Sequence, residues 1–490
     1  MSDESALEGL SDQERRLDRL RQRLGLWLGP AAFVLVLLSP LGLEPSAQRL
    51  AAVLALVMVY WISEALPLPV TAFLGPALAT LLGVGRARDV FAPFGDPVIF
   101  LFIGSFLLAE ALSVHGLDRR IALHLLSLPG VARSPSRIRW VMGLAAAGIS
   151  AWMSNTATAA MMVPIALGLV RALRAAGSPE PARATLLVMG ISASLGGLAT
   201  PVGTPPNLIV LGFLERSGGS PVSFLTFMLL GVPISLALLA TMLLVVGWMI
   251  PPAPRGLDLS GHFAAERASV PVWGSGQTAC AAAFGLAVLL WIGPSLAEAA
   301  GWVSTSQRLE ESVVALLAAG LLFLWPVGER TALTWKEGRR IDWGTLLLFG
   351  GGLSLGKMMF DTGLAERLAK ATVAVTGVDS LWGLTALVLA ASILLTEATS
   401  NTAAATMLAP LVLALASGLG VASVPPLLAV AFGASMGFMF PISTPPNAIV
   451  YGTGLVPITS MMRIGVVVDL LSFFVIFAGL RILCPLLGLA

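Results

Sequence analysis

Long apolar runs follow one another along almost the whole chain. They lie near 26–43, 49–63, 66–84, 97–115, 138–175, 184–213, 223–250, 276–298, 311–328, 344–360, 380–418, 424–455 and 462–487. One crossing of a hydrocarbon core roughly 30 Å thick needs about 20 such residues. The pattern therefore predicts an all-α polytopic membrane protein.

Two of these runs, 138–175 and 380–418, are too long for a single crossing. Each carries the triplet Ser-Asn-Thr near its middle, at 154–156 and 400–402. Lysine and arginine favour the cytoplasmic side of a membrane, and arginines flank the first run at both ends: Arg133, Arg137, Arg139, Arg171 and Arg174. Both ends are then cytoplasmic, which predicts a re-entrant helical hairpin with the triplet at its tip.

The chain also repeats itself at an interval of about 240 residues. Residues 102–122 parallel 349–369, 155–164 parallel 401–410, and 201–207 parallel 441–447. The first copy carries five arginines between 116 and 139, whereas the matching stretch 361–383 carries only Arg367 and Lys370. This asymmetry predicts repeats of opposite orientation, as in many secondary transporters. Threading the runs predicts eleven transmembrane helices plus two re-entrant hairpins, with the N-terminus cytoplasmic and the C-terminus external.

Composition agrees with a membrane location. Only 11% of the residues are charged and 57% are hydrophobic, against about 25% charged residues in soluble domains. Cys280 and Cys484 lie in separate apolar runs and predict neither a disulfide framework nor a metal cage. The polar stretch 1–25 lacks the apolar core of a signal peptide, so we interpret it as a retained cytoplasmic helix.

The two triplets and the two later Thr-Pro-Pro-Asn segments, at 204–207 and 444–447, are polar clusters inside apolar sequence. Such clusters at membrane depth mark function. At a hairpin tip, the second limb exposes unpaired N–H groups that favour an anion, and the first limb exposes carbonyls that favour a cation. Thr204 can cap a helix that restarts at Pro205, so we expect a helix broken near Gly203.

No lysine or arginine lies within these four segments, and neither does any carboxylate. An anion would be held by hydroxyls, amides, helix ends and bound cations. Hard cations prefer oxygen ligands, and the motifs offer oxygens that suit a weakly held Na⁺. Two symmetric cation sites would neutralise a dianion.

With these motifs assembled, the chain resembles the divalent anion:sodium symporter (DASS) family, the INDY-type dicarboxylate transporters of bacteria. The resemblance covers nearly all of 25–490. It implies a homodimer in the inner (plasma) membrane that works as an elevator, with a scaffold domain at 26–137 and 251–379. It implies a transport domain at 138–250 and 380–490, containing the hairpins 138–175 and 380–418 and the broken helices 184–213 and 424–455.

The resemblance also implies three sets of site residues. The first cation site would use Ser150, Ser154, Asn155 and Gly203. The second would use Thr396, Thr399, Asn401 and Ser443. The substrate would contact Asn155, Thr156, Thr204, Ser400, Asn401, Thr402, Thr444 and Pro445. Thr399 and Ser443 replace Met153 and Gly203 of the first repeat, so the two cation sites are expected to differ.

The expected function is sodium-coupled symport of a small dianion such as succinate, with no organic cofactor and no nucleic-acid partner. Malate, fumarate, 2-oxoglutarate, citrate and sulfate stay open as substrates, as do a sodium-independent exchanger and an anion channel. An enzyme is disfavoured because Ser154 and Ser400 lack a matched base, so no catalytic residues are assigned. Glu397 could carry a proton, but its counterpart is Ala151, and we interpret it as structural.

Overall fold

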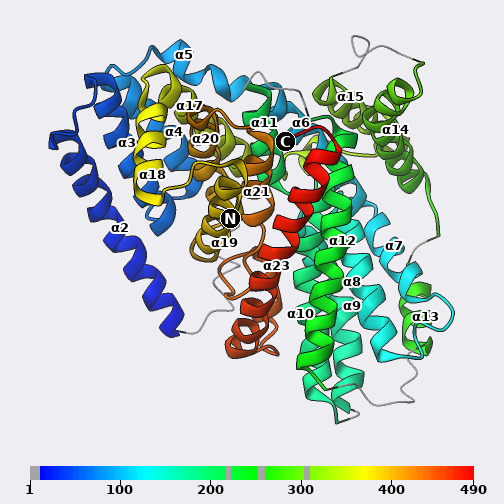
Figure 1. Cartoon of the computed structure of the whole chain (residues 1–490). Helices are drawn as coiled ribbons and strands as arrows, with labels where there is room; N and C mark the ends of the chain where they lie inside the picture. The colour runs from blue at the N-terminus through cyan, green and yellow to red at the C-terminus, as the bar shows by residue number, and fades with distance from the viewer. Residues whose placement is uncertain (1–11, 176, 217–221, 252–259, 271, 303–309) are drawn as a thin grey trace.

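The protein is almost entirely helical. The computed structural model describes residues 12–175, 177–216, 222–251, 260–270, 272–302 and 310–490. Its first elements are α2 (Asp12–Leu38), α3 (Pro45–Ser63), α4 (Leu68–Leu81), α5 (Ala87–Phe91) and the 3₁₀ turn η1 (Ala92–Gly95). Helices α2 and α3 form the left edge of the molecule in Figure 1, and α5 lies at its top. The helix expected at 1–25 and the first apolar run form one uninterrupted helix from Asp12 to Leu38, and residues 1–11 lie outside the described part.

The first repeat supplies a bundle of long helices at the lower right of Figure 1. It contains α6 (Pro97–Val114), α7 (Leu117–Leu126), α8 (Pro135–Ser150), α9 (Asn155–Ala175), α10 (Pro179–Gly196), η2 (Gly197–Ala199), α11 (Pro205–Arg216) and α12 (Phe224–Met249). The connection to the second repeat contains α13 (Ser260–Ala268), α14 (Ser275–Ala299), α15 (Glu311–Leu324), the paired two-residue strands β1 (Pro326–Val327) and β2 (Arg330–Thr331), and α16 (Trp335–Gly338).

The second repeat follows the same order of elements. It contains α17 (Trp343–Asp361), α18 (Leu364–Thr376), α19 (Leu381–Ala398), α20 (Asn401–Leu419), α21 (Val424–Gly433), α22 (Pro445–Gly452) and α23 (Ile458–Leu486). Equivalent glycines turn the chain in both copies, because Gly116 before α7 and Gly363 before α18 adopt φ of 60° and 70°. Only glycine adopts this left-handed conformation without steric cost.

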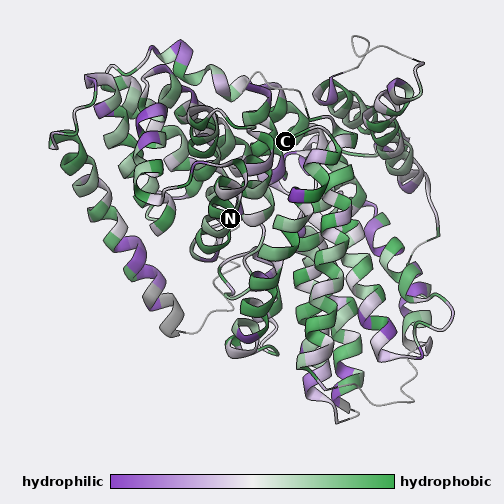
Figure 2. Ribbon diagram, in the orientation of Figure 1, coloured by the Kyte–Doolittle hydropathy of each residue, from purple (hydrophilic) through white to green (hydrophobic). Residues whose placement is uncertain are grey.

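The outer surface suits a lipid environment. Within the described ranges, ten helices are long and apolar enough to cross a membrane, and three shorter apolar helices accompany them: Leu68–Leu81, Glu311–Leu324 and Val424–Gly433. Figure 2 shows apolar residues along the outward faces of the long helices. Trp248 and Leu324, for example, expose 83% and 77% of their surface. Large exposed apolar surfaces of this kind are rare on soluble monomers.

The helix that was expected to break near Gly203 stops at Ala199 and resumes at Pro205, and its counterpart stops at Gly433 and resumes at Pro445. Proline suits the first position of a helix, because its missing N–H would have had no partner there. The repeats also pack crosswise: α9 contacts α22, and α20 contacts α11. Each helix that begins at a triplet therefore lies against the restarted helix of the other repeat.

Candidate substrate and cation site

Residues 151–156, which we name the first tip, join the contacting helices α8 and α9. The Ser154 hydroxyl accepts the N–H of Ala157 at 3.2 Å and so caps α9. The Ser150 hydroxyl, at the end of α8, donates to the Asn155 side-chain oxygen at 2.8 Å. This hydrogen bond ties the end of one helix to the start of the next.

Residues 397–402, the second tip, reproduce this network between α19 and α20. The Ser400 hydroxyl accepts the N–H of Ala403 at 3.2 Å, and the Thr396 hydroxyl donates to the Asn401 side-chain oxygen at 2.8 Å. In each repeat a hydroxyl therefore fixes the amide oxygen of the triplet asparagine. The amide nitrogen, which makes no hydrogen bond to the described residues, is left as a donor for an anionic oxygen.

The asparagines of the two Thr-Pro-Pro-Asn segments use their amide nitrogens within the protein. The Asn207 amide nitrogen donates to the carbonyls of Gly197 and Thr200 at 2.9 and 2.8 Å. The Asn447 amide nitrogen donates to the carbonyls of Gly437 and Phe440 at 2.9 and 3.0 Å. We call each arrangement an asparagine clamp, because it satisfies carbonyls that the break leaves without helical partners. The sequence pointed to these segments but did not indicate this role.

Oxygen atoms from the first tip and the first broken helix meet beside Gly203. A Cβ atom added there would lie 2.6 Å from the Gly197 carbonyl oxygen and 2.9 Å from that of Ala151. A Cβ atom on Gly197 would lie 2.6 Å from the Asn155 side-chain oxygen. Glycine at both positions therefore lets several uncharged oxygens converge, which is the ligand chemistry that a hard cation such as Na⁺ requires.

Burial divides the expected site residues into two groups. Ser150, Thr396, Ser443 and Thr399 expose between 0% and 2% of their surface, as suits ligands of an enclosed cation. Thr156 and Pro445 are exposed, and Asn155, Ser400, Asn401 and Thr402 are half-buried, as suits contacts to a substrate. Ser154, which was expected as a cation ligand, is exposed as well.

Three expected site residues have a different environment from the one the motifs implied. Thr204 and Thr444 are buried at 2% exposure each, and the Thr444 hydroxyl accepts the N–H of Asn447 at 3.3 Å to cap α22. The exposed Ser154 serves as the cap of α9. The Thr444 and Ser154 hydroxyls therefore fix the starts of α22 and α9.

An acid lies beside the second tip, where the first tip has Ala151 at the matching position. The Ser443 hydroxyl donates to the Glu397 carboxylate at 2.7 Å, and the Met439 N–H donates to its other oxygen at 3.0 Å. The Thr399 hydroxyl donates to the Leu395 carbonyl at 3.2 Å. Glu397, only 5% exposed, thus holds the second broken segment against the second tip.

A basic side chain reaches the second tip from a distant part of the chain. Arg21 of α2 donates to the Ala398 carbonyl oxygen at 3.4 Å and forms ion pairs with Asp18 at 2.8 Å and Glu64 at 3.1 Å. The absence of lysine and arginine from the motifs did not reveal this contact, since it joins residues 377 positions apart.

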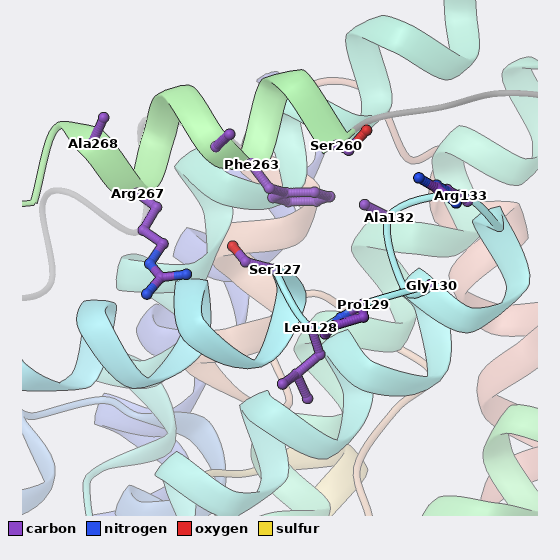
Figure 3. A pocket seen from close by; sticks show the side chains of 11 residues that line it. Ser127, Leu128, Pro129, Gly130, Ala132, Arg133, Ser260, Phe263, Arg267 and Ala268 are labelled. Carbon is purple, nitrogen blue, oxygen red and sulfur yellow. The ribbon is translucent and has the colours of Figure 1, made fainter.

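Among the described residues, open pockets also occur away from the motifs. The pocket in Figure 3, of about 630 Å³, is formed by the loop after α7 and by α13, with Phe263, Arg133 and Arg267 among its lining side chains. Another, of about 730 Å³, lies between α18 and α20 and is lined by Phe360, Lys370 and their neighbours. No triplet residue lines either pocket, so neither is the candidate site.

Comparison with known proteins assigns the family. The citrate transporter family matches residues 58–428. The chain belongs to this family. It is 36% identical to an uncharacterized transporter of Haemophilus influenzae over 90% of this chain and 93% of that protein. It is 32% identical to the sodium-dependent dicarboxylate transporter SdcS of Staphylococcus saprophyticus over 96% of this chain and 93% of that protein.

These findings confirm the resemblance that the motifs carried. The chain is a multi-pass membrane transporter and not an enzyme. A more distant likeness concerns the fold alone: the crystal structure of the YdaH transporter of Alcanivorax borkumensis matches with a TM-score of 0.52 and 15% identity, over 85% of this chain and 88% of that one.

Proposed function

We propose that this transporter carries a small dianion, most favourably a C4-dicarboxylate such as succinate, together with Na⁺. The observation that carries the proposal is the twinned network at the tips, where Ser150 fixes Asn155 and Thr396 fixes Asn401. Each network presents an amide nitrogen to a carboxylate and places uncharged oxygens behind it for a cation. The sodium-dependent dicarboxylate transporters at 31–32% identity support the same substrate class.

In this mechanism the cations bind first and make the tips electrically attractive to the dianion. Ser150, Ser154, Asn155 and Gly203 surround one Na⁺, and Thr396, Thr399, Asn401 and Ser443 surround the other. The carboxylates then meet Asn155, Thr156, Ser400, Asn401 and Thr402, with Thr204, Thr444 and Pro445 at the starts of the restarted helices. Without bound Na⁺, the hydroxyl and carbonyl oxygens of the tips repel the carboxylates of the substrate. The dianion therefore binds only together with Na⁺, and this makes its transport depend on the sodium gradient.

We further propose a homodimer in the plasma membrane with a cytoplasmic N-terminus and an external C-terminus. The segments 26–137 and 251–379 form the scaffold, and the segments 138–250 and 380–490 move across it as an elevator. The crosswise packing of α9 on α22 and of α20 on α11 supports this division, because it joins both tips into one body.

Uptake by proteoliposomes tests the proposal. Labelled succinate, citrate and sulfate are offered separately, each with an inward Na⁺ gradient or with K⁺ in its place. We expect saturable succinate uptake that requires Na⁺ and collapses when the gradient is dissipated. Citrate uptake in preference to succinate would agree with the description of the family and contradict the C4 assignment. Uptake that needs internal substrate but no Na⁺ would replace symport with exchange, and single-channel currents would indicate a channel.

A further inference from the structure

The pocket in Figure 3 has the charge of an anion site. It has a volume of about 630 Å³, and Arg133 and Arg267 are among its lining residues. None of the described residues that line it is acidic. In Figure 3 the two arginines lie on opposite sides of the Phe263 ring, which is fully buried. Two guanidinium groups around one opening favour a compact anionic ligand such as a phosphate group.

The walls of the pocket are held in place by contacts within the protein. Gly130 has a φ of 82°, a conformation that suits glycine, and its carbonyl oxygen accepts a hydrogen bond from Arg137 at 3.2 Å. Arg119 of α7 donates to Glu266 of α13 at 2.9 Å and holds the two helices together. This ion pair neutralises Glu266, whereas no side-chain hydrogen bond or ion pair joins the adjacent Arg267 to a described residue.

The protein around the pocket carries an excess of positive charge. The segment 116–139 contains five arginines and one acid, Asp118, and that acid is buried. Arg139, one turn into α8, is buried as well, and its Nη1 atom has no hydrogen-bond partner in the described part of the chain. Nearby acids therefore do not balance the positive potential of this region, which attracts anions to the pocket.

Both elements that form the pocket lie at the ends of membrane-spanning helices. Helix α7 follows the span that ends at Val114, and α13 lies between the span that ends at Met249 and the one that begins at Ser275. The Gln277 amide donates to the His115 carbonyl at 3.0 Å, so the end of α6 and the start of α14 lie on one side of the membrane. The pocket is therefore near the level of the lipid headgroups, where the hydrocarbon core gives way to water.

Apolar and aromatic side chains accompany the arginines. Leu128, which lines the pocket, is exposed, and so are Val272 and Trp273 after α13. The Arg120 guanidinium lies 5.6 Å from the centre of the Trp273 ring, and the Trp273 indole N–H donates to the Thr278 hydroxyl at 2.8 Å. Tryptophan is enriched at the membrane–water boundary because its ring is apolar and its N–H is polar. Exposed apolar groups beside a basic pocket suit the acyl chains of a lipid, which a soluble phosphate compound lacks.

We propose that this pocket binds the headgroup of an anionic phospholipid. Arg133 and Arg267 hold the phosphate oxygens, and the acyl chains lie along the apolar surface beside Leu128. Basic pockets at the ends of membrane spans bind anionic headgroups through the same chemistry. No residue of either tip lines the pocket, so the lipid is a partner of the transporter and not its substrate. The proposal does not depend on which dianion is carried.

Binding of a pyrene-labelled phosphatidylglycerol to the purified protein in detergent tests the site, with energy transfer from the tryptophans as the signal. Phosphatidylcholine with the same label measures binding that needs no anionic headgroup, and we expect it to bind more weakly. Arg267→Gln should weaken phosphatidylglycerol binding about fivefold, and Arg133→Gln combined with Arg267→Gln about 25-fold, since each basic residue near a membrane contributes roughly 1 kcal/mol. Arg267→Lys keeps the charge and should retain most of the affinity.

Arg88→Gln is the matched control, because Arg88 is an exposed arginine of α5, at the opposite end of the molecule from α13 in Figure 1. It should bind phosphatidylglycerol as the native protein does. Equal phosphatidylglycerol affinity in the native protein and the double variant, with folding confirmed by gel filtration, would overturn the proposal. Phosphatidylcholine binding as tight as that of phosphatidylglycerol would overturn it too. Millimolar inorganic phosphate should leave the lipid bound, and its displacement would assign the pocket to a soluble phosphate compound instead.

Discussion

At the scale of single residues, the two tips differ from ordinary polar positions in membrane helices by what their hydroxyls bind. Many serine and threonine hydroxyls of this protein donate to the backbone carbonyl four residues earlier, as Thr241 does to Ala237. Such a bond satisfies the hydroxyl group within its own helix and contacts no other element. Ser150 and Thr396 instead donate to Asn155 and Asn401 across each tip, and Thr396 shares its proton with the Ala434 carbonyl at 2.6 Å. The residue pattern Ser-Asn-Thr therefore matters through the hydroxyl that precedes it by four positions.

Replacing either asparagine should abolish transport while the protein still folds. Asn155→Ala and Asn401→Ala each remove the amide donor that we assign to the substrate, together with one oxygen assigned to Na⁺. We expect succinate uptake to fall at least 100-fold, since a buried hydrogen bond to a charged group contributes roughly 1.5–3 kcal/mol and each change removes more than one contact. Proteoliposome uptake measures the loss, and Thr241→Ala serves as control. Native uptake rates in either variant would refute the site.

At the scale of elements, the broken helices depend on a side chain to replace backbone hydrogen bonds. The sequence predicted a break near Gly203 from Thr-Pro-Pro-Asn, because proline marks a restart. It did not show that Asn207 and Asn447 close the break from inside, since that function depends on where the carbonyls ten and seven residues earlier are placed. A proline indicates a helix start from its own position in the sequence. The asparagine clamp, in contrast, can be recognised only once the turn that brings these carbonyls together has been described.

Both clamps should be needed for stability more than for substrate recognition. Asn207→Leu and Asn447→Leu leave two buried carbonyls without donors, which costs about 1–3 kcal/mol for each unsatisfied group. We expect a lower apparent melting temperature in detergent for both, and a similar loss because the geometry is the same. Asn447→Asp should behave alike, since a carboxylate cannot donate to the carbonyls. A variant with native thermal stability would show that the clamp is dispensable.

The short helix α16 gives an element whose stability depends on pH. Its capping box joins Thr334 and Glu337, and Arg330 donates to Glu337 at 2.6 Å. Partial burial raises the pKa of Glu337, but the hydrogen bonds from Thr334 and Arg330 outweigh it and lower that pKa to about 2. Because the folded pKa lies below the ordinary 4.5, the carboxylate stabilises this turn at neutral pH.

That stabilisation should be lost as the pH falls from about 4.5 toward 2. Hydrogen exchange of the amides in 334–338 measures it, with faster exchange expected at the acid end after correction for intrinsic rates. Glu337→Gln should exchange faster than the native protein at neutral pH and lose its acid dependence. An identical profile in both proteins would contradict the assignment.

At the scale of the whole molecule, the repeat, the helical membrane class and the family followed from sequence, because apolar runs and repeated motifs are local signals. Asp469 is an acid inside the apolar helix α23, yet its burial depends on how α23 packs against α19 and α21. The Arg21 contact and the crosswise packing of the repeats likewise join segments that no local pattern relates. Long-range placement is what the sequence left open.

One ion pair bears on how the proposed domains move. Arg216 at the end of α11 donates through two nitrogens to Asp96 at 3.0 and 2.6 Å, and Asp96 also caps α6 by accepting the N–H of Val98. Helix α11 belongs to the proposed transport domain and α6 to the scaffold. If the first slides past the second, this pair exists in only one end state and stabilises it.

Breaking the pair should therefore change the rate of transport more than the affinity for substrate. Arg216→Gln and Asp96→Asn both remove the charge pairing, and the asparagine keeps an acceptor for the cap. If the charged hydrogen bonds of this pair contribute roughly 1.4 kcal/mol to one end state, they shift the equilibrium between the two end states about tenfold. We expect succinate exchange rates to change by about that factor in either variant, and the double variant to add little because the pair acts as one unit. Lys370→Gln, in an exposed pair on a single helix, should leave the rate unchanged. If Arg216→Gln instead exchanged succinate at the native rate but bound it more weakly, Arg216 would belong to the substrate site. The ion pair would then have no role in the motion of the proposed domains.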